Sequence, residues 1–198
     1  MSEEFQVERM GECGVDSPMD SSFFVGDEAR VLADVTLAGW RAGDGPPASL
    51  EQAGPRRKIY FEPDRTRAAV VTCGGLCPGL NDTIRAVTMV LWYRYGVREI
   101  LGLRYGYEGL VEGVGREPVP LTPEVVEDIH QQGGTMLGSS RGPQDVEAMV
   151  DTLAGRGINL LFTIGGDGTQ RGALAIARRA REQNLDTAVV GIPKTIDN

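Results

Sequence analysis

The feature that most restricts the fold of this chain is an alternation of short apolar runs with amphipathic segments, which starts near residue 67. The apolar runs have the length and composition of buried parallel strands and occupy residues 68–73, 99–103, 158–164 and 187–192. The amphipathic segments have helical periodicity and occupy residues 79–95, 122–132, 143–154 and 172–183. This order predicts an α/β domain that has a mostly parallel sheet with helices on both faces.

Residues 1–67 lack this alternation and read as a separate part of the chain. Turn and linker signals such as Gly43-Asp44-Gly45-Pro46-Pro47 interrupt them. We expect a partly mobile N-terminal extension here, with short strands or docking segments within residues 22–35 and 58–61. The α/β domain is then expected over residues 68–198.

Charge and composition exclude several classes of protein. The net charge of −8 argues against bulk binding of nucleic acid, which needs a basic surface. The longest apolar stretch, residues 86–93, is too short to span a bilayer, and no signal peptide is visible, so a cytoplasmic protein without membrane contact is expected. Cys73 and Cys77 are predicted to be packing residues, because three cysteines cannot form a four-cysteine zinc site.

Three of the predicted strands are followed by loops of unusual composition, two of them rich in glycine and the third a polar loop. The chain has 27 glycines among 198 residues, about twice the usual frequency. The loops occupy residues 74–81, 165–169 and 193–198. Because ligands of parallel sheets bind beyond the carboxyl ends of the strands, we expect these loops to form one site.

The Gly-Gly-Asp-Gly-Thr loop at residues 165–169 carries the strongest chemical signal. A carboxylate such as Asp167, between glycines at a strand end, suits Mg²⁺ that is also bound to nucleotide phosphates. Gly168 leaves room for a phosphate, and Thr169 offers an N–H group and a hydroxyl. An ordinary turn is the alternative.

The other two loops are less specific by themselves. Gly74 and Gly75 let backbone N–H groups approach an anion beside a helix start, although a tight turn without ligand has the same composition. In residues 193–198, Asp197 could act as a base with the Thr195 hydroxyl two residues earlier. A plain polar loop is the alternative there.

Two further segments contain candidate ligand-binding side chains. Arg141 lies in residues 133–142, which are too rich in glycine for a plain connector, and its planar guanidinium could clamp a phosphate or remain solvated. Tyr107, in the turn-rich residues 105–110, could stack on a base or line the core.

Together and in this order, these segments resemble the motifs of 6-phosphofructokinases. The residues that carry the resemblance are 74–81, 106–110, 133–141, 165–169 and 193–198, and it covers residues 68–198. Residues 24–34 and 58–61 also resemble the N-terminal extension of the plant-type branch of that family.

The resemblance implies transfer of the γ-phosphate of ATP, with Mg²⁺, to the 1-hydroxyl of fructose 6-phosphate. It implies that the nucleotide is lined by Gly75, Tyr107, Arg141, Gly142, Gly166, Asp167, Gly168 and Thr169. Asp167 would hold the metal and Arg141 would neutralise charge. Thr195, Ile196 and Asp197 would meet the sugar, with Asp197 as proton acceptor. A homo-oligomer, a dimer or a tetramer, is expected.

The phosphoryl donor is predicted from Gly168 and Lys194. The resemblance implies that pyrophosphate users carry Asp where Gly168 stands, a carboxylate that would face the nucleotide α-phosphate. Gly168 together with Lys194 is similar to the plant-type ATP enzymes, so ATP is favoured over a pyrophosphate-dependent phosphofructokinase. The Gly-Gly-Asp-Gly-Thr loop also occurs in lipid kinases and NAD kinases, but the loops at 73–81 and 193–198 argue against them.

The sequence ends at Asn198, where the family motif continues with another Asp. We therefore expect a domain that is incomplete at its C-terminus and lacks the half that supplies most contacts to fructose 6-phosphate. Residues 1–198 alone are expected to bind Mg²⁺-ATP weakly and to show no turnover. A non-catalytic nucleotide-binding fragment or subunit is the alternative from a different functional class.

Overall fold

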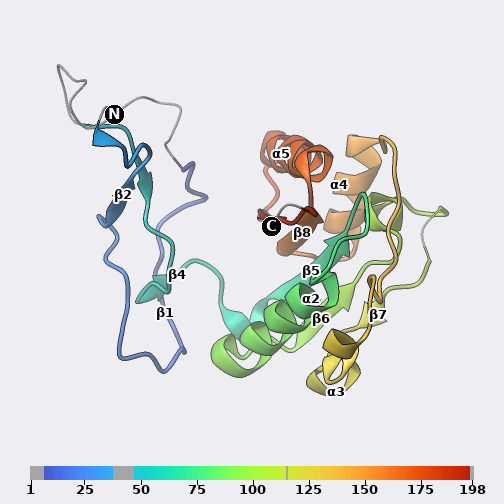
Figure 1. Cartoon of the computed structure of the whole chain (residues 1–198), viewed down its shortest axis with the longest axis horizontal. Coiled ribbons are helices and arrows are strands. Elements are labelled where there is room, and N and C mark those ends of the chain that lie inside the picture. Colours follow the sequence, from blue (N-terminus) through green and yellow to red (C-terminus); the bar gives the residue numbers. More distant parts are fainter. Residues whose placement is uncertain (1–6, 38–46, 115, 197–198) are drawn as a thin grey trace. The chain divides into compact units, whose positions relative to one another are not determined.

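The computed structural model describes residues 7–37, 47–114 and 116–196. Contacts divide the chain into two compact units, one that ends at Phe61 and one that starts at Glu62. In the first unit, β1 (Val15–Asp16) pairs with β4 (Lys58–Ile59), and β2 (Arg30–Leu32) pairs with β3 (Ser49–Glu51), both antiparallel (Figure 1). β2 and β4 lie within the ranges where short strands were expected, whereas β1 and β3 lie outside those ranges.

The second unit is built on a five-stranded sheet with the order β7-β6-β5-β8-β9. Its strands are β5 (Arg67–Thr72), β6 (Glu99–Gly102), β7 (Val119–Pro120), β8 (Leu160–Gly165) and β9 (Ala188–Pro193). All neighbouring pairs are parallel except β6 with β7. The predicted mostly parallel sheet is therefore confirmed.

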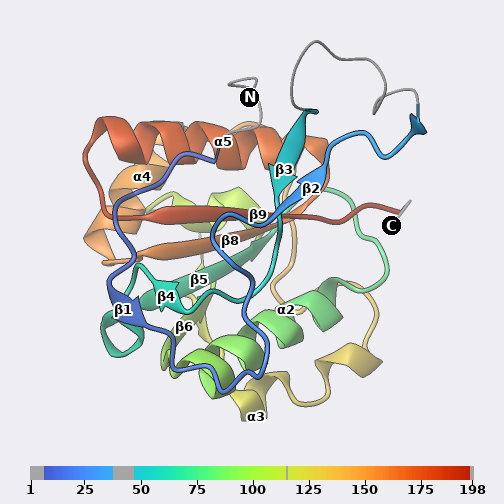
Figure 2. The same ribbon diagram turned by 90° about the vertical axis from the view of Figure 1, so that its left-hand side faces the viewer.

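Helices cover both faces of this sheet, as predicted. Figure 2 shows α4 (Val146–Gly155) and α5 (Asp167–Glu182) on one face, and α2 (Leu80–Met89) with the short α3 (Pro123–Val126) on the other. Among the described residues, no helix is both long enough and apolar enough to cross a membrane.

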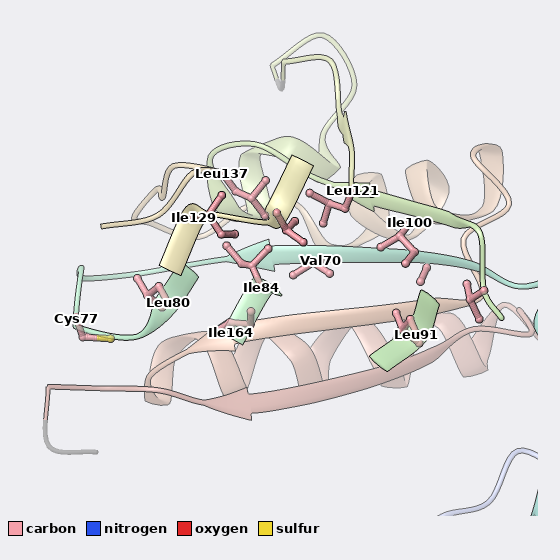
Figure 3. Packing of buried hydrophobic residues seen from close by; sticks show 13 residues of the cluster. Val70, Cys77, Leu80, Ile84, Leu91, Ile100, Leu121, Ile129, Leu137 and Ile164 are labelled. Carbon is pink, nitrogen blue, oxygen red and sulfur yellow. The ribbon is translucent and has the colours of Figure 1, made fainter. Parts of the chain in front are cut away.

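The central strand β5 separates two hydrophobic clusters, because its side chains alternate between the faces of the sheet. Val70 packs with Ile84 and other residues on the α2 side (Figure 3), whereas Val71 packs with residues such as Leu153 and Ile176 on the α4 and α5 side. Cys77 belongs to the first cluster and Cys73 to the second. Both thiols are therefore packing groups, as predicted.

Two predicted helices differ in length or type from the structure. Residues 79–95 form α2 followed by a π-helical segment, η3 (Val90–Tyr95), which ends at Gly96 with φ 78°. The predicted helix at 122–132 was wrong in extent. After α3 the backbone leaves the helical conformation at Asp128, and only a 3₁₀ turn, η5 (Ile129–Gln131), follows. Acidic residues such as Asp128 are unfavourable near a helix C-terminus, which explains the early end.

Two helix starts also differ from the prediction. Helix α4 begins at Val146 rather than 143, because the Asp145 carboxylate accepts a hydrogen bond of 2.9 Å from the Glu147 N–H and caps the helix there. Helix α5 begins at Asp167 rather than 172. The glycine-rich loop therefore forms the first turn of α5. The strand β7 was not predicted, because two residues ending in a proline give too weak a signal.

Candidate functional site

A cavity of about 610 Å³ lies beyond the carboxyl ends of β5 and β8, at the starts of α4 and α5. This is the edge of the sheet where the rule for parallel sheets places ligands. The lining residues are Cys73, Gly74, Gly75, Tyr107, Ser140, Arg141, Gly142, Pro143, Gln144, Val146, Met149, Gly166, Asp167, Gly168, Thr169, Arg171 and Gly172.

The cavity brings together every residue that the sequence analysis assigned to the nucleotide. They come from the loop after β5, the η4 turn (Gly106–Leu110), the segment before α4 and the start of α5. Arg141 lies over the first of these loops, because a Cβ atom added at Gly75 would be 3.5 Å from Nη2 of Arg141. The structure therefore gathers the predicted residues, and their roles toward a nucleotide stay predictions.

The first turn of α5 faces this cavity with backbone N–H groups that have no acceptor within the helix. The first main-chain bond of the helix runs from the Gln170 N–H to the Gly166 carbonyl, at 3.0 Å. By helix geometry, the preceding N–H groups, including those of Asp167 and Gly168, have no acceptor within the helix. Asp167 is exposed, and a Cβ atom at Gly168 would have no atom within 4 Å.

Gly165 is required at the end of β8 because three loops meet there. A Cβ atom at Gly165 would lie 2.4 Å from Oγ1 of Thr169 and 2.5 Å from the Cys73 carbonyl oxygen. The Gly165 carbonyl also accepts hydrogen bonds from the Lys194 N–H, at 3.1 Å, and from Nε2 of Gln170, at 3.0 Å. Any larger residue would push these loops apart.

Tyr107 forms part of the cavity wall and supports α5. Its side chain is 8% exposed, and its hydroxyl donates a hydrogen bond of 2.6 Å to the Thr169 carbonyl. Its ring packs against Gly172, where a Cβ atom would lie 2.5 Å from Cε2. Burial raises the pKa of Tyr107 above its usual value, so the phenol remains a hydrogen-bond donor at neutral pH.

The loop after β9, which starts at Lys194, lies against the other two. A Cβ atom at Gly166 would be 3.5 Å from Cγ2 of Thr195, and one at Gly79 would be 3.2 Å from Cε of Lys194. Of the three residues predicted to contact the sugar, the structure describes two. Thr195 is half-buried beside the nucleotide loop, Ile196 is 80% exposed and does not line the cavity, and Asp197 lies outside the described residues.

The sequence analysis missed several lining residues. Val146 and Met149 belong to the amphipathic face of α4, and periodicity alone cannot distinguish a cavity wall from a core. Arg171 and Gly172 had a usable signal, because they lie about one helical turn after Asp167 and Gly168. The late start assigned to α5 concealed that relation.

Comparisons with known proteins agree with this geometry. A family model described as "Phosphofructokinase" matches residues 67–198. The ATP-dependent 6-phosphofructokinase of Borreliella burgdorferi is 46% identical over 98% of this chain and 45% of its own length. ATP-dependent 6-phosphofructokinase 7 of Arabidopsis thaliana is 53% identical over 78% of this chain and 32% of its own length.

Solved structures give the same result for the fold. The Pichia pastoris phosphofructokinase in the T-state matches with a TM-score of 0.59 and 27% identity, over 75% of this chain and 18% of that one. A pyrophosphate-dependent phosphofructokinase from Marinobacter aquaeolei matches with a TM-score of 0.59 at 20% identity, which bears on the fold alone, over 67% of this chain and 34% of that one. The chain spans less than half the length of the curated relatives it matches. On these matches, the chain belongs to the phosphofructokinase family.

Proposed function

We propose that this chain carries the nucleotide site of an ATP-dependent 6-phosphofructokinase. The reaction would transfer the γ-phosphoryl group of ATP to the 1-hydroxyl of fructose 6-phosphate and give fructose 1,6-bisphosphate, a step of glycolysis. The observation that carries the proposal is the cavity in which Arg141, Gly75 and the first turn of α5 converge. Relatives named as ATP-dependent enzymes, at 46% and 53% identity, support the choice of reaction.

The cavity offers what phosphoryl transfer requires from a protein, which is positioning and neutralisation of charge rather than covalent chemistry. The N–H groups of the first turn of α5, which have no acceptor within the helix, and the positive end of its dipole favour phosphate oxygens. The guanidinium of Arg141 presents a planar set of donors that matches a phosphate group. These groups would hold the transferring phosphoryl group in one orientation.

Asp167 is the proposed magnesium ligand. Among the residues that line the cavity it supplies the carboxylate, and it is exposed beside the N–H groups of α5. Mg²⁺ suits such a donor set, because it is usually held by one or two carboxylates together with waters and phosphate oxygens. When bound, it would neutralise charge on the phosphates during transfer.

The sugar end of the site remains a proposal from the motif. Asp197 would accept the proton of the 1-hydroxyl, and Thr195 and Ile196 would contact the sugar. Thr195 supports this arrangement, because it lies against Gly166 at the nucleotide loop. An ordinary carboxylate with a pKa of about 3.9 is a weak base. That suffices, since a loose transition state demands little proton removal until late.

ATP is proposed over pyrophosphate as the donor because the space beside Gly168 is open. A homo-oligomer, dimeric or tetrameric, and a cytoplasmic location are proposed from the family.

Titration with Mg²⁺-ATP tests the site on this chain, and a coupled assay for fructose 1,6-bisphosphate tests the reaction on the natural gene product.

Asp167→Ala gives the sharpest variant for both measurements. We expect the variant to lose magnesium-dependent binding of ATP and to lower kcat by several orders of magnitude, because the metal would lose its carboxylate. Asp151→Ala, at an exposed carboxylate of α4 that does not line the cavity, is the matched control for loss of a charged side chain. A kcat of Asp167→Ala within about tenfold of wild type, less than about 1.4 kcal/mol of barrier, would contradict the assignment.

A further inference from the structure

The segment that carries Arg141 has little regular structure, yet buried side chains hold its backbone at several points. It runs from Gln132 to Arg141, between η5 and α4. We propose that Thr72 and Asn81 are positioning residues of the site, which hold this segment so that the Arg141 guanidinium lies over Gly75. Neither residue lines the cavity. The inference rests on the proposed function in one respect, namely that Arg141 binds a phosphate.

Thr72 is the last residue of β5 and is fully buried. Its Oγ1 lies 2.8 Å from the Gly138 carbonyl oxygen and 2.9 Å from Oγ1 of Thr135. A carbonyl can only accept, so Thr72 donates its one hydrogen to Gly138 and Thr135 must donate to Thr72. The Thr135 oxygen in turn accepts the Leu137 N–H, at 3.3 Å. The Thr72 hydroxyl therefore joins Gly138 and Thr135 of this segment through one connected set of hydrogen bonds, which also includes the Leu137 N–H.

Asn81 holds the N-terminal part of the segment through two hydrogen bonds. It lies in the first turn of α2 and is 2% exposed. Its Nδ2 donates to the Gln132 carbonyl at 3.0 Å, and its Oδ1 accepts from the Met136 N–H at 2.8 Å. Only one orientation of the amide satisfies both partners, so a single side chain fixes two backbone positions four residues apart.

The last residues before Arg141 are joined to the glycine-rich loop after β5. Ser139 donates from Oγ to the Gly74 carbonyl at 2.6 Å, and the Gly74 N–H donates to the Ser140 carbonyl at 3.1 Å. Gly75, over which Arg141 lies, follows directly. Gly75 follows β5 by three residues, and the last residue of β5 is Thr72, whose hydroxyl holds the Arg141 segment.

Buried polar groups need partners in any protein, so the same bonds could serve folding alone. The two roles differ in their dependence on Arg141. If Thr72 only stabilises the fold, its removal has the same effect whether or not Arg141 is present. If Thr72 positions Arg141, removing the hydroxyl weakens phosphate binding only while the guanidinium is there.

The test is a double-mutant cycle on this chain. Thr72→Val keeps the shape and removes the hydroxyl, whereas Thr72→Ser keeps the hydroxyl and is the matched control. The readouts are the affinity for Mg²⁺-ATP by titration and hydrogen exchange of the amides of residues 137–141. We expect Thr72→Val to weaken binding about tenfold, the scale of one lost hydrogen bond with its partners left unpaired. We expect Thr72→Ser to stay within about twofold and exchange to quicken only in the valine variant.

In the Arg141→Ala background, Thr72→Val should change the affinity no further. An equal loss in both backgrounds, or equal behaviour of Val and Ser, would overturn the inference. Asn81→Asp, which keeps the acceptor but places an oxygen against the Gln132 carbonyl, repeats the test if Thr72→Val fails to fold. Amides of β5 and β8 report global unfolding in the same exchange data.

If the proposed function is wrong, the experiment shows it separately from a failure of the positioning role. If the wild-type chain binds no Mg²⁺-ATP, the nucleotide site is wrong, and exchange alone then decides the positioning of the segment. Faster exchange at residues 137–141 in Thr72→Val but not in Thr72→Ser supports it. Unchanged exchange refutes it.

Discussion

Tyr107 belongs both to the cavity wall and to the support of α5. The sequence left open whether its ring stacks on a base or lines the core. The structure buries the ring against Gly172 and directs the hydroxyl to the Thr169 carbonyl, 62 residues further along the chain. A bond over that separation leaves no trace in local sequence, so the sequence could indicate the residue but not its main contact.

Tyr107→Phe should therefore weaken the fold while leaving the cavity shape intact. The ring remains, but the Thr169 carbonyl loses its 2.6 Å hydrogen bond. We expect the free energy of unfolding to fall by about 1 kcal/mol, measured by urea denaturation. Tyr93→Phe, at a side chain that is 67% exposed, is the control and should change nothing measurable. Equal stability of Tyr107→Phe and wild type would show that the hydroxyl contributes nothing.

Gly168 is the residue at which donor selectivity is expected to reside. Its missing side chain leaves open space in the first turn of α5. Gly168→Asp would place a carboxylate where the α-phosphate of ATP is proposed to lie, so we expect a sharp loss of Mg²⁺-ATP affinity. The affinity for pyrophosphate should increase, because Lys194 is already present. Titration with both ligands checks this, and an unchanged affinity for ATP would refute the steric and electrostatic argument.

At the scale of elements, strands were easier to predict than helix ends. The apolar runs at 68–73 and 158–164 match β5 and β8 within one or two residues, because a strand buried on both faces needs a continuous apolar sequence. Helix α5 starts at Asp167, earlier than predicted. The prediction placed the start too late because glycine by itself disfavours a helix. A tertiary hydrogen bond from Tyr107 to the Thr169 carbonyl and a local one from the Gln170 side chain to the Gly165 carbonyl hold that first turn in place.

The location of the candidate site was predictable from the glycine-rich segments rather than from the apolar runs. Glycine loops at strand ends indicate a close approach of backbone and ligand, and they led to Gly75 and Asp167, whereas the glycine-rich segment 133–142 led to Arg141. The wall contributed by α4 was not predictable. Val146 and Met149 have the spacing of core residues, and only the tertiary structure shows which apolar side chains face a cavity.

The junction of β8 and α5 gives a prediction at this scale. Gly165→Ala would force a methyl group against Thr169 and the Cys73 carbonyl, so we expect a loss of unfolding free energy of about 1–3 kcal/mol and a weaker affinity for Mg²⁺-ATP. Gly168→Ala is the matched control for stability, because its added carbon meets no atom and replaces a helical glycine. Calorimetry would measure both, and equal melting temperatures would contradict the packing argument.

At the scale of the whole chain, buried apolar residues are unevenly distributed between the two units. Among the described residues, Val25 is the buried apolar side chain of the unit that ends at Phe61, and the remaining ones lie in the second unit. The first unit instead exposes large apolar side chains such as Phe23 and Val35. Stability of the chain is therefore expected to reside mainly in the sheet and its helices.

The three thiols should report this difference. Cys13 is exposed, whereas Cys73 and Cys77 are buried. Burial also raises the pKa of the Cys73 thiol from 9.0 to about 12, and the thiolate is the reactive form. We expect Cys13 to react with a thiol reagent within seconds to minutes at pH 8, and Cys73 to react only on unfolding. Mass spectrometry of the labelled chain checks the order, and rapid labelling of Cys73 would contradict its burial.

The same thiol predicts a pH dependence. The folded chain keeps a proton on Cys73 that the unfolded chain loses above pH 9, so this contribution to stability is complete below pH 9 and declines as the pH rises toward 12. Cys73→Ala should flatten the decline in urea unfolding measured across that range. An identical slope in the variant would show that Cys73 does not contribute.

The connections that build the cavity join distant parts of the chain, and this determines when the site can form. The bonds from Thr72 to Gly138, from Ser139 to Gly74, and from Thr169 to Cys73 span 66, 65 and 96 residues. Closing such long loops is slow, and the local helices cannot make these bonds by themselves. A refolding chain should therefore gain helical signal before it gains any capacity to bind a nucleotide.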